Sequence, residues 1–570
     1  MRTFVYSALA TIVGSTFLAG CSDDGDGTGG QFEGVRANYI DTYEEGTGTI
    51  SKPEILDSAT YSAEVESGGE FTSYPATVTD GVVEIPDVPE GAYYYQILGN
   101  EPQANGYQAF RSFIHSSERD LDLGVFRVSR PDVAPLTETF AINLGGTLTR
   151  PWQTFEQDAK GQVIQPYDDY VTVASVRAGM AGNAFAFYDS DASFKNGSPT
   201  LEGLSVDAET VLQSLIGSGG LVLADGSKGD EIVLIHQVQH GLDEKLGVPD
   251  GTEAWPAGNY YVAEAMANVA PVTMSDGEDV TLEGNFEDLP MESVDVDVRG
   301  SDFVSLITAA HAEGAVVASS AYFSVAWEPR ANIVSANYYG EVLNVNADAL
   351  SMPVDPVCYP DGEGMCDPAA CAAGCNDAMS LVWPDDLQAT FEYGNPFGGE
   401  GVYYAVARYS FTVRRTDVDR ELSDTMPGSL TVSRPVGSSE PFVPVVGFVR
   451  DIRLNEQSTA DEGVLEGVGT SPVVSFDPPE LGTPTFYRVT IWTAEDILDE
   501  EGNPKIRKGR IARILTADTT VTIPPGVLTP GGIYLAQVEA VQNDEWTPGR
   551  PYAGSLTTGT AEIGTGYFTP

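Results

Sequence analysis

Short runs of alternating apolar and polar residues, separated by Gly and Pro, make up most of this chain from residue 39 onward. The runs are rich in Val, Tyr, Thr and Phe, which are the residues that favour strands. A period of two indicates strands with one buried face, and the Gly and Pro clusters indicate turns between them. The pattern predicts an all-β protein with several β-sandwich domains in tandem.

A Pro-x-Gly-x-Tyr phrase recurs before four of these runs. It ends at Tyr93, Tyr260 and Tyr534, and a looser copy with Gly in place of Pro ends at Tyr403. Pro and Gly form the turn, because Gly adopts backbone angles that are closed to other residues. We expect each Tyr to enter a strand with its ring buried and its hydroxyl bonded to loop backbone. Four unevenly spaced copies favour four sandwich units over a solenoid.

Two segments break the period of two and predict short helices, at residues 208–216 and 301–313. Each places its apolar residues on one face and ends before a glycine, Gly217 or Gly314. Neither is long enough to suggest an α/β core. We expect both helices to pack against a sheet or to cap a sandwich.

The first 20 residues read as a secretory signal. Arg2 precedes an apolar stretch over residues 4–17 that is too short to span a membrane. Leu18, Ala19 and Gly20 then precede Cys21, and this arrangement resembles the bacterial lipobox. The resemblance implies a lipid on Cys21, a membrane partner through that lipid, and an outer-membrane or cell-surface location, since Ser22 follows the cysteine.

The predicted order of domains follows from these signals and from the turn phrases. It comprises a signal peptide (1–20), a Gly- and Asp-rich flexible tether (21–31), a β-sandwich (32–135), a β-sandwich with a short helix (136–300), a β-rich domain with a Cys-rich loop at 358–375 (301–440), and a last sandwich (441–570).

The last 100 residues resemble a fibronectin type III domain. Strand patterns lie at 473–476 and 486–492, and a Leu-x-Pro turn that begins at Leu528 leads to Tyr534 and then to Val538 and Ala540. Phe476 stands where that family usually has Trp. Near the N-terminus, residues 80–93 resemble one hairpin of the transthyretin-like or carboxypeptidase-regulatory-like sandwich, which implies an accessory module there.

The charge of the chain excludes one class of partner. The 84 acidic and 29 basic residues give a formal charge of −55, and the acidic residues occur along the whole chain. Phosphate would be repelled across such a surface, so we expect no nucleic-acid partner. Two explanations stay open for the composition, which are adaptation to high salt and an ordinary acidic secreted protein.

Four cysteines follow Cys21, and all lie within one short segment. In an exported protein this number favours two disulfides. Three pairings are possible, and the spacing selects none of them. Zinc is the alternative, but the paired Cys-x-x-Cys knuckles of such sites are missing. The four are Cys358, Cys366, Cys371 and Cys375.

The histidines give little support for a metal site. His236 and His240 are four residues apart in a β-type run, so one metal could bind both only across a bulge in the strand. His311 shares a helical face with apolar residues and is expected to be a packed histidine. His115 has no partner in sequence. We therefore predict no metal, no cofactor and no catalytic histidine.

No catalytic motif stands out, and we predict that the protein is not an enzyme. Three acidic clusters read as solvated turns, and the aromatic runs at 93–95 and 260–261 could line a carbohydrate platform, although alternation assigns at least half of them to the core. The predicted function is a structural or adhesive module array with an unknown protein or polysaccharide ligand. A carbohydrate-binding or polysaccharide-processing accessory protein is the alternative, and an exported enzyme without a motif is a weaker one. The acidic clusters are Asp168-Asp169, Asp385-Asp386 and 499–501.

Overall fold

The computed structural model has two units, Met1–Glu33 and Gly34–Pro570. The first unit lies outside the described residues except for Glu33. The described residues are 33–45, 48–53, 59–99, 109–124, 126–127, 141–154, 156–157, 163–165, 167–175, 185–187, 195–207, 232–241, 259–273, 275, 277–311, 316–327, 341–346, 386–396, 401–415, 422–459, 463–498, 504–552 and 558–570.

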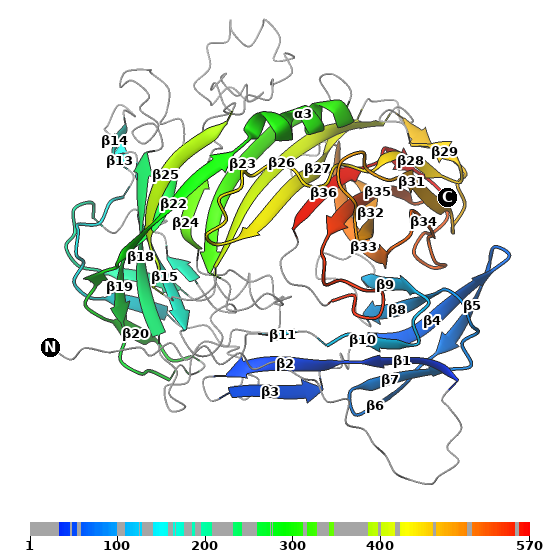
Figure 1. The fold of residues 1–570 in the computed structure, drawn as a ribbon, viewed down its shortest axis with the longest axis horizontal. Coiled ribbons are helices and arrows are strands. Elements are labelled where there is room, and N and C mark those ends of the chain that lie inside the picture. Colours follow the sequence, from blue (N-terminus) through cyan, green and yellow to red (C-terminus); the bar gives the residue numbers. More distant parts are fainter. Residues whose placement is uncertain are drawn as a thin grey trace, which may run out of the picture. The chain divides into compact units, whose positions relative to one another are not determined.

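One 19-stranded sheet runs through the second unit (Figure 1). Its strands, in order of pairing, are β16 (Phe185–Phe187), β15 (Tyr170–Ser175), β18 (Ile232–Gly241), β19 (Asn259–Asn268), β24 (Glu341–Asn346), β23 (Val316–Trp327), β26 (Gly401–Arg415), β27 (Leu422–Pro435), β36 (Gly559–Gly564), β35 (Ile533–Gln542), β32 (Phe486–Leu498), β33 (Pro504–Thr516), β9 (Arg111–Ser116), β8 (Tyr93–Gly99), β4 (Ala59–Ser67) and β5 (Glu70–Pro75). Three short strands pair beside these, namely β21 (Glu287–Asp288), β37 (Tyr567–Phe568) and β30 (Val464–Leu465). All but two of the pairings are antiparallel, and the parallel ones join β33 to β9 and β30 to β37.

Four smaller sheets pack against sections of this long sheet. They are β10 (Asp120–Asp122), β1 (Gly34–Asn38), β7 (Val82–Pro86) and β6 (Thr77–Thr79); β17 (Leu204–Asp207), β12 (Ala141–Gly145) and β20 (Val280–Glu283); β22 (Met291–Val298) and β25 (Leu387–Gly394); and β29 (Gln457–Ser458), β28 (Arg450–Leu454), β31 (Val473–Asp477) and β34 (Thr520–Thr522). The remaining sheets join β11 (Phe126–Arg127), β2 (Ile40–Glu45) and β3 (Gly48–Pro53), and β13 (Glu156–Gln157) and β14 (Val163–Gln165).

Three apolar cores lie between these layers. One joins the β1–β7 sheet to β4, β8 and β9, a second joins the β12–β20 sheet to β15 and β18, and the largest lies under β22, β25, β28 and β31. The all-β sandwich architecture is therefore confirmed. The hydrogen-bonded ladder also continues from β27 to β36 and from β33 to β9, so neighbouring sandwich units share one sheet.

Side-chain alternation explains which strands have one buried face. In β22, Val294, Val296 and Val298 are buried in the largest core, whereas the aspartates between them face outward. β18 differs, because Ile232 and Leu234 enter one core while Val233 and Ile235 enter another. A strand that is covered on both faces must be almost continuously apolar, as the sequence of β18 is.

The described residues contain one helix, α3 (Gly300–Ala310), which covers β23 and β26 (Figure 1). It buries Phe303 and Ile307 in the largest core, so the helix predicted at 301–313 is confirmed and ends three residues early. The helix predicted at 208–216 lies outside the described residues. No helix in the described part of the chain is long and apolar enough to span a membrane.

The four Pro/Gly-x-Gly-x-Tyr phrases do lead into strands, which are β8, β19, β26 and β35. The rings of Tyr93, Tyr403 and Tyr534 are buried. The Tyr93 hydroxyl donates to the Glu118 carbonyl at 2.5 Å, and the Tyr534 hydroxyl accepts the Thr529 N–H at 2.9 Å. The predicted tyrosine-to-loop bonds are therefore confirmed at these two turns.

The hairpin expected at residues 80–93 is wrong in one respect. β7 and β8 do not pair with each other, because β7 lies in the β1 sheet and β8 lies in the long sheet. The turn at Gly91, whose φ is 113°, carries the chain across the core from one layer to the other. The apolar faces of both strands, with Val83 and Ile85 on β7, meet in that core.

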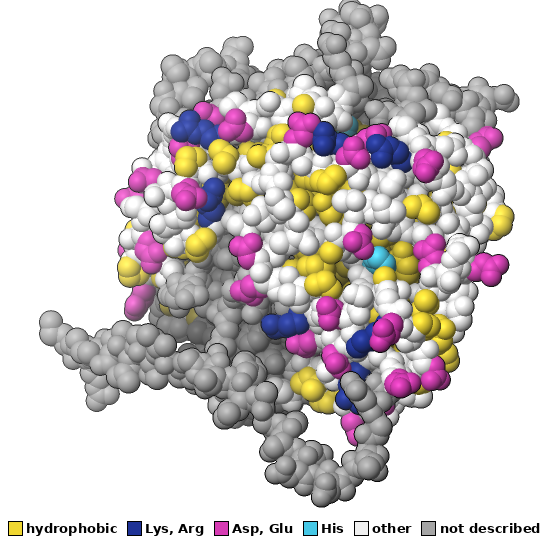
Figure 2. Space-filling model, turned by 45° about the vertical axis from the view of Figure 1, so that its right-hand side comes forward, with side chains coloured by type: hydrophobic (Ala, Val, Ile, Leu, Met, Phe, Trp, Pro, Cys, Tyr) yellow, Lys and Arg dark blue, Asp and Glu magenta, His cyan; other side chains and the backbone are white. Residues whose placement is uncertain are grey.

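Acidic side chains are scattered over the face drawn in Figure 2, and most Lys and Arg side chains there lie next to them. Several of these contacts are exposed ion pairs, such as Arg450–Glu480 at 2.5 Å. Exposed pairs add little to stability. They do reduce the repulsion between neighbouring carboxylates on a surface of this charge.

Candidate functional site

A cleft of about 710 Å³ lies where α3 meets the strands of the C-terminal sandwich. The helix contributes Leu306, Ala309 and Ala310 to its wall. The opposite wall comes from residues 447–452, which include the start of β28, from Glu480 and Leu481 after β31, and from Ile563 and Gly564 on β36. The cleft therefore joins α3 to β28, to the turn after β31 and to β36, which are separate in the sequence.

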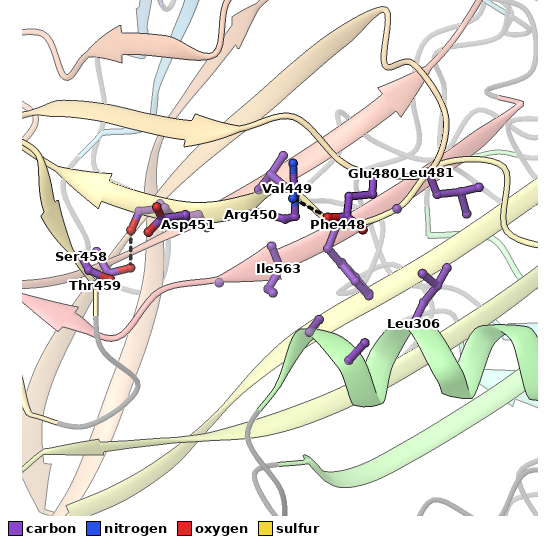
Figure 3. A pocket seen from close by; sticks show the side chains of 15 residues that line it. Leu306, Phe448, Val449, Arg450, Asp451, Ser458, Thr459, Glu480, Leu481 and Ile563 are labelled. Atoms are coloured by element: carbon purple, nitrogen blue, oxygen red, sulfur yellow. Dashed lines mark hydrogen bonds and ion pairs between the residues drawn. The ribbon is translucent and has the colours of Figure 1, made fainter.

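The floor of the cleft is apolar. In Figure 3 Leu306 rises from α3 toward Phe448, and Ile563 lies on the strand beside them. Phe448 and Ile563 belong to the largest core, whereas Leu481 is 38% exposed at the rim. A concave apolar surface with a few polar groups is the usual form of a binding site.

The polar rim is made of paired charges. Arg450 donates to Glu480 at 2.5 Å, and Asp451 accepts a hydrogen bond from Arg453. Asp451 has a φ of 49°, at a bulge where β28 carries one residue more than its partner β31. Bulges redirect side chains at the edges of sheets. The bulge places Asp451 at the cleft with its carboxylate held by Arg453.

The lining residues do not include a nucleophile that is paired with a base. Thr459 is the lining hydroxyl with a described bond, and it donates to the Ile452 carbonyl at 3.0 Å. The carboxylates of Asp451 and Glu480 are both engaged by arginines. The cleft is therefore suited to binding, and its described residues offer no arrangement for acid–base chemistry.

A pair of carboxylates, one buried and one half-buried, lies on the opposite face of the long sheet. Glu562 on β36 is directly opposite Glu539 on β35, and Glu539 is 9% exposed. Burial, and then the charge of Glu539, raises the pKa of Glu562 to about 7. Successive residues of a strand point to opposite faces, so Glu562 points away from the cleft that Ile563 lines.

His236 and His240 both lie on β18, and each is bonded to its own carboxylate. His236 Nε2 is 3.1 Å from Asp169 Oδ2, and His240 Nε2 is 2.7 Å from Glu264 Oε1. The His236 ring also stacks on Trp152, with 5.5 Å between the ring centroids. In the described part of the chain, no group of three or more His, Cys, Asp or Glu side chains could hold a metal ion.

The expectation that Asp168-Asp169 is a solvated turn is wrong for Asp169, which is fully buried. Its carboxylate accepts the backbone N–H groups of Gln153 and Gln239 at 2.9 and 3.2 Å, together with His236 and the Gln153 amide. Four donors compensate the loss of water around the charge. Asp169 therefore fastens β15 and β18 together.

Glu264 has a similar position nearer the surface. It accepts Arg150 Nη1 at 3.0 Å as well as His240, and these bonds hold the pKa of the carboxyl below its usual range although burial opposes them. His240 stacks on Tyr260, which packs against Phe391 in turn. The group connects β18, β19 and β25.

The other two histidines are packed against aromatic rings. His311 lies just after α3 and not within the helix as predicted, but it is packed as expected, with its ring centroid 4.6 Å from that of Phe411. His115 lies 4.6 Å from the Tyr94 ring, with Nδ1 3.2 Å from Thr516 Oγ1 and 3.3 Å from Asp518 Oδ2. Burial lowers the pKa of both imidazoles.

The aromatic runs that could have formed a carbohydrate platform are largely internal. Tyr93, Tyr94 and Tyr95 are all buried, because β8 lies between two cores, and Tyr260 and Tyr261 are half-buried. No aromatic side chain whose exposure is described is exposed.

The remaining predicted sites lie outside the described residues. They are the lipidation site Cys21 and the four cysteines at 358, 366, 371 and 375. Asp385 and residues 499–501 are also outside, whereas Asp386 accepts Arg299 and Ser301 at 3.2 Å each.

Sequence reasoning missed both the cleft and the Glu539–Glu562 pair. The cleft joins segments with no shared motif. One feature of the sequence pointed to the pair. Glu539 is a charged residue within the mainly apolar strand at residues 533–541. Comparison of the chain with known protein families and with curated proteins finds no match.

Proposed function

We propose that this protein is a bacterial surface lipoprotein, anchored through Cys21, that acts as a structural or adhesive module array. Its cleft between α3 and β28 receives a polypeptide partner. The Gly- and Asp-rich residues 21–31 link the lipid to the folded body. The body carries the binding surface outward.

The continuous long sheet carries this proposal. Four small sheets rest on one hydrogen-bonded ladder, so neighbouring units cannot rotate without breaking backbone bonds. A string of independent enzymatic or regulatory domains does not need such a ladder. A rigid body suits a protein that presents a binding surface of fixed shape.

The strand order of the C-terminal unit supports the resemblance to fibronectin type III. β28, β31 and β34 form one layer, and β33, β32, β35 and β36 form the other. Phe476 packs edge-on against Tyr487 across the core, at a centroid distance of 4.8 Å. Domains of this kind are common in surface proteins.

The cleft favours a polypeptide over a sugar. Leu306 and Phe448 offer an apolar floor for side chains, Leu481 adds an exposed apolar residue at the rim, and the Arg450–Glu480 pair there can exchange bonds with a peptide. Sugar rings stack on exposed aromatic faces, and the described residues present none. The enzyme alternative draws on the Glu539–Glu562 pair, which points away from the cleft.

The experiment compares two exposed apolar residues, one at the cleft and one elsewhere. Purified protein is screened against a peptide array and a glycan array, and the strongest ligand is titrated against two variants. Leu481→Glu should weaken binding at least about tenfold, because it places a charge on the apolar rim. Met291→Glu, on the outer face of β22, should leave binding unchanged. Equal binding by both variants, or binding to glycans alone, would remove the proposal for the cleft.

The anchor has a separate test. Cys21→Ser should release the protein from the membrane fraction and prevent the mass increase that acylation causes. Retention in the membrane with an unchanged mass would remove the lipoprotein part of the proposal and leave the cleft unaffected.

A further inference from the structure

Charged side chains gather on one section of the long sheet, on the face opposite the cleft. The section lies on β33, β32 and β35, where residues directly opposite in the ladder share a face. At one end, Leu515 and Val541 enter the core of the N-terminal sandwich. At the other end, the Gln537 amide donates to the Pro427 carbonyl of β27 at 2.8 Å. The charged section therefore lies between two packed ends.

A β-bulge brings two arginines of β33 to this face. Arg510 and Arg513 are three residues apart, and on a regular strand such residues point to opposite faces. β33 has one residue more than β32 between them, because Arg510 is opposite Trp492 whereas Arg513 is opposite Thr490. Both arginines therefore share the face of Thr490 and Trp492. Bulges often redirect side chains in this way beside functional sites.

A third arginine, Arg488 on β32, is already paired. It is directly opposite Glu539 on β35 and donates a hydrogen bond to that carboxylate. Glu562 is next in the same row, on β36. Burial, and then the charge of Glu539, raises the pKa of Glu562 to about 7, so this carboxyl is only partly ionised at pH 7. Three arginines thus meet two carboxylates across this section, and one of the carboxylates carries less than a full charge.

Arg513 is an arginine without an acceptor. Its side chain is half-buried, its Nε is shielded from solvent, and it makes no hydrogen bond or ion pair within the part of the chain that the structure describes. The charged side chains that act on it are Arg488, Arg510 and Glu539. Burial, and then the two neighbouring arginines, lowers the pKa of its guanidinium. A shielded donor that lacks an acceptor costs free energy, which an incoming acceptor would recover.

This arrangement is unusual for a chain with 84 acidic and 29 basic residues. Other arginines are in ion pairs with carboxylates, as Arg36 is with Glu84 and Arg507 is with Glu495. Carboxylates are abundant along the chain, yet none of the described ones is bonded to Arg513. The acceptor that its position calls for can come from outside the chain.

We propose that this face of the sheet is a binding site for a small oxyanion, which accepts hydrogen bonds from Arg513 with Arg510 beside it. The planar guanidinium fork matches two oxygens of a carboxylate, sulfate or phosphate group. Trp492 supports Arg510, because its ring centroid lies 5.3 Å from the Arg510 Cζ and its Nε1 donates to Gln537 at 3.0 Å. The site is on the face opposite the cleft and does not rest on the proposed function.

The charge of the whole chain selects the size of the ligand. A polyanion such as a nucleic acid would meet carboxylates all along its length and be repelled. A small oxyanion meets mainly the charges within the Debye length, which is about 8 Å at physiological ionic strength. Within that range the arginines of this section act on it. The ligand is therefore a single anionic group, either inorganic or the carboxylate of a small organic acid.

Thermal unfolding of the full chain tests the site. Sodium sulfate, sodium phosphate and sodium acetate are each compared with sodium chloride at equal ionic strength, so that screening is the same in all four. An anion that binds the folded state raises the melting temperature with its concentration, and the rise gives its dissociation constant. At least one oxyanion should raise the melting temperature above its value in chloride. A response to acetate supports an organic carboxylate as the ligand, and a response to sulfate or phosphate alone supports an inorganic one.

Two variants of β33 locate the response. Arg513→Gln should weaken binding of the responding oxyanion at least about tenfold, because it removes the charged donor. Arg507→Gln is the matched control, since Arg507 lies on the same strand but pairs with Glu495 on the other face, and it should keep the native response. No rise above chloride in the native protein overturns the proposal. So does an equal rise in Arg513→Gln, which would mean an adventitious ion only.

A further variant serves if Arg513→Gln does not fold. Arg510 is exposed, so Arg510→Gln leaves the cores intact. It should raise the dissociation constant at least about threefold by removing one nearby positive charge, and an unchanged constant overturns the proposal. Leu481→Glu, at the cleft, should keep the response to the oxyanion, so failure of the cleft as a peptide site and failure of this anion site are distinguishable.

Discussion

The Nε2 atom of His311 lies 3.1 Å from the hydroxyl oxygen of Tyr409. That hydroxyl donates its only proton to the Glu562 carbonyl, so it accepts from His311, whose proton is therefore on Nε2. The chain of bonds ties the end of α3 to β26 and β36. Burial lowers the pKa of His311 to about 4, so the ring is neutral at pH 7.

Acid should weaken the fold around α3. The pKa of His311 in the folded protein lies below its ordinary 6.5, so its contribution is complete above pH 6.5 and is lost as the pH falls toward 4. The full effect is about 3 kcal/mol. Denaturant unfolding of the native protein and of His311→Gln from pH 7 to pH 4 measures it as a difference, so that other titrating groups cancel. An identical acid dependence in both proteins would contradict it.

Removing the charge of Asp169 should destabilise the β15–β18 region strongly. Asp169→Asn exchanges one acceptor for a donor beside groups that are themselves donors, and we expect a loss of about 3–5 kcal/mol. Asp295→Asn is the control, because this exposed carboxylate accepts one described bond, from Thr390, and its change should stay below about 1 kcal/mol. Chemical denaturation compares the two. A cost for Asp169→Asn no larger than that of the control would show that the buried charge is dispensable.

Two substitutions of Tyr534 should separate the stabilising contribution of its hydroxyl hydrogen bond from that of its buried ring. Its hydroxyl accepts the Thr529 N–H, and its ring lies over Gly532, in the core that also holds Leu528. Tyr534→Phe should cost about 1 kcal/mol, and Tyr534→Ala about 3–5 kcal/mol by analogy with other aromatic truncations. Exchange of the β35 amides in the full chain measures both. Unchanged amide exchange in both variants would mean that the tyrosine does not stabilise the turn.

Sodium chloride should raise the melting temperature of the protein. With a formal charge of −55, repulsion weakens the folded state in dilute buffer, and screening removes this as the Debye length falls to about 3 Å at 1 M salt. The increase should level off once screening saturates. A melting temperature that is flat or falling from low to molar salt would remove the interpretation that this surface is adapted to salt.

Local features of the fold could be predicted because their physics is local. The turn that precedes Tyr534 is determined by a few adjacent residues. The alternation of apolar and polar residues in β22 can likewise be read from the eight residues of that strand. The partners of His236 and Glu562 could not be predicted, because they depend on strand register. Asp169 is 67 residues from His236, and only the pairing of β15 with β18 brings them together. The cleft was missed for the same reason.

The parallel pairing of β33 with β9 imposes an order of assembly. Residues 111–114 bond to residues 512–515, about 400 positions later in the chain. During synthesis the N-terminal layers emerge first, and the outer edge of β9 stays unpaired until about the last eighth of the polypeptide arrives. Unpaired edges invite association with other chains, and closure over such a separation is slow. This protein should therefore depend on a holding chaperone while it folds. A truncation before residue 504 should aggregate, because the N-terminal core also loses Leu515, Val541 and Trp546.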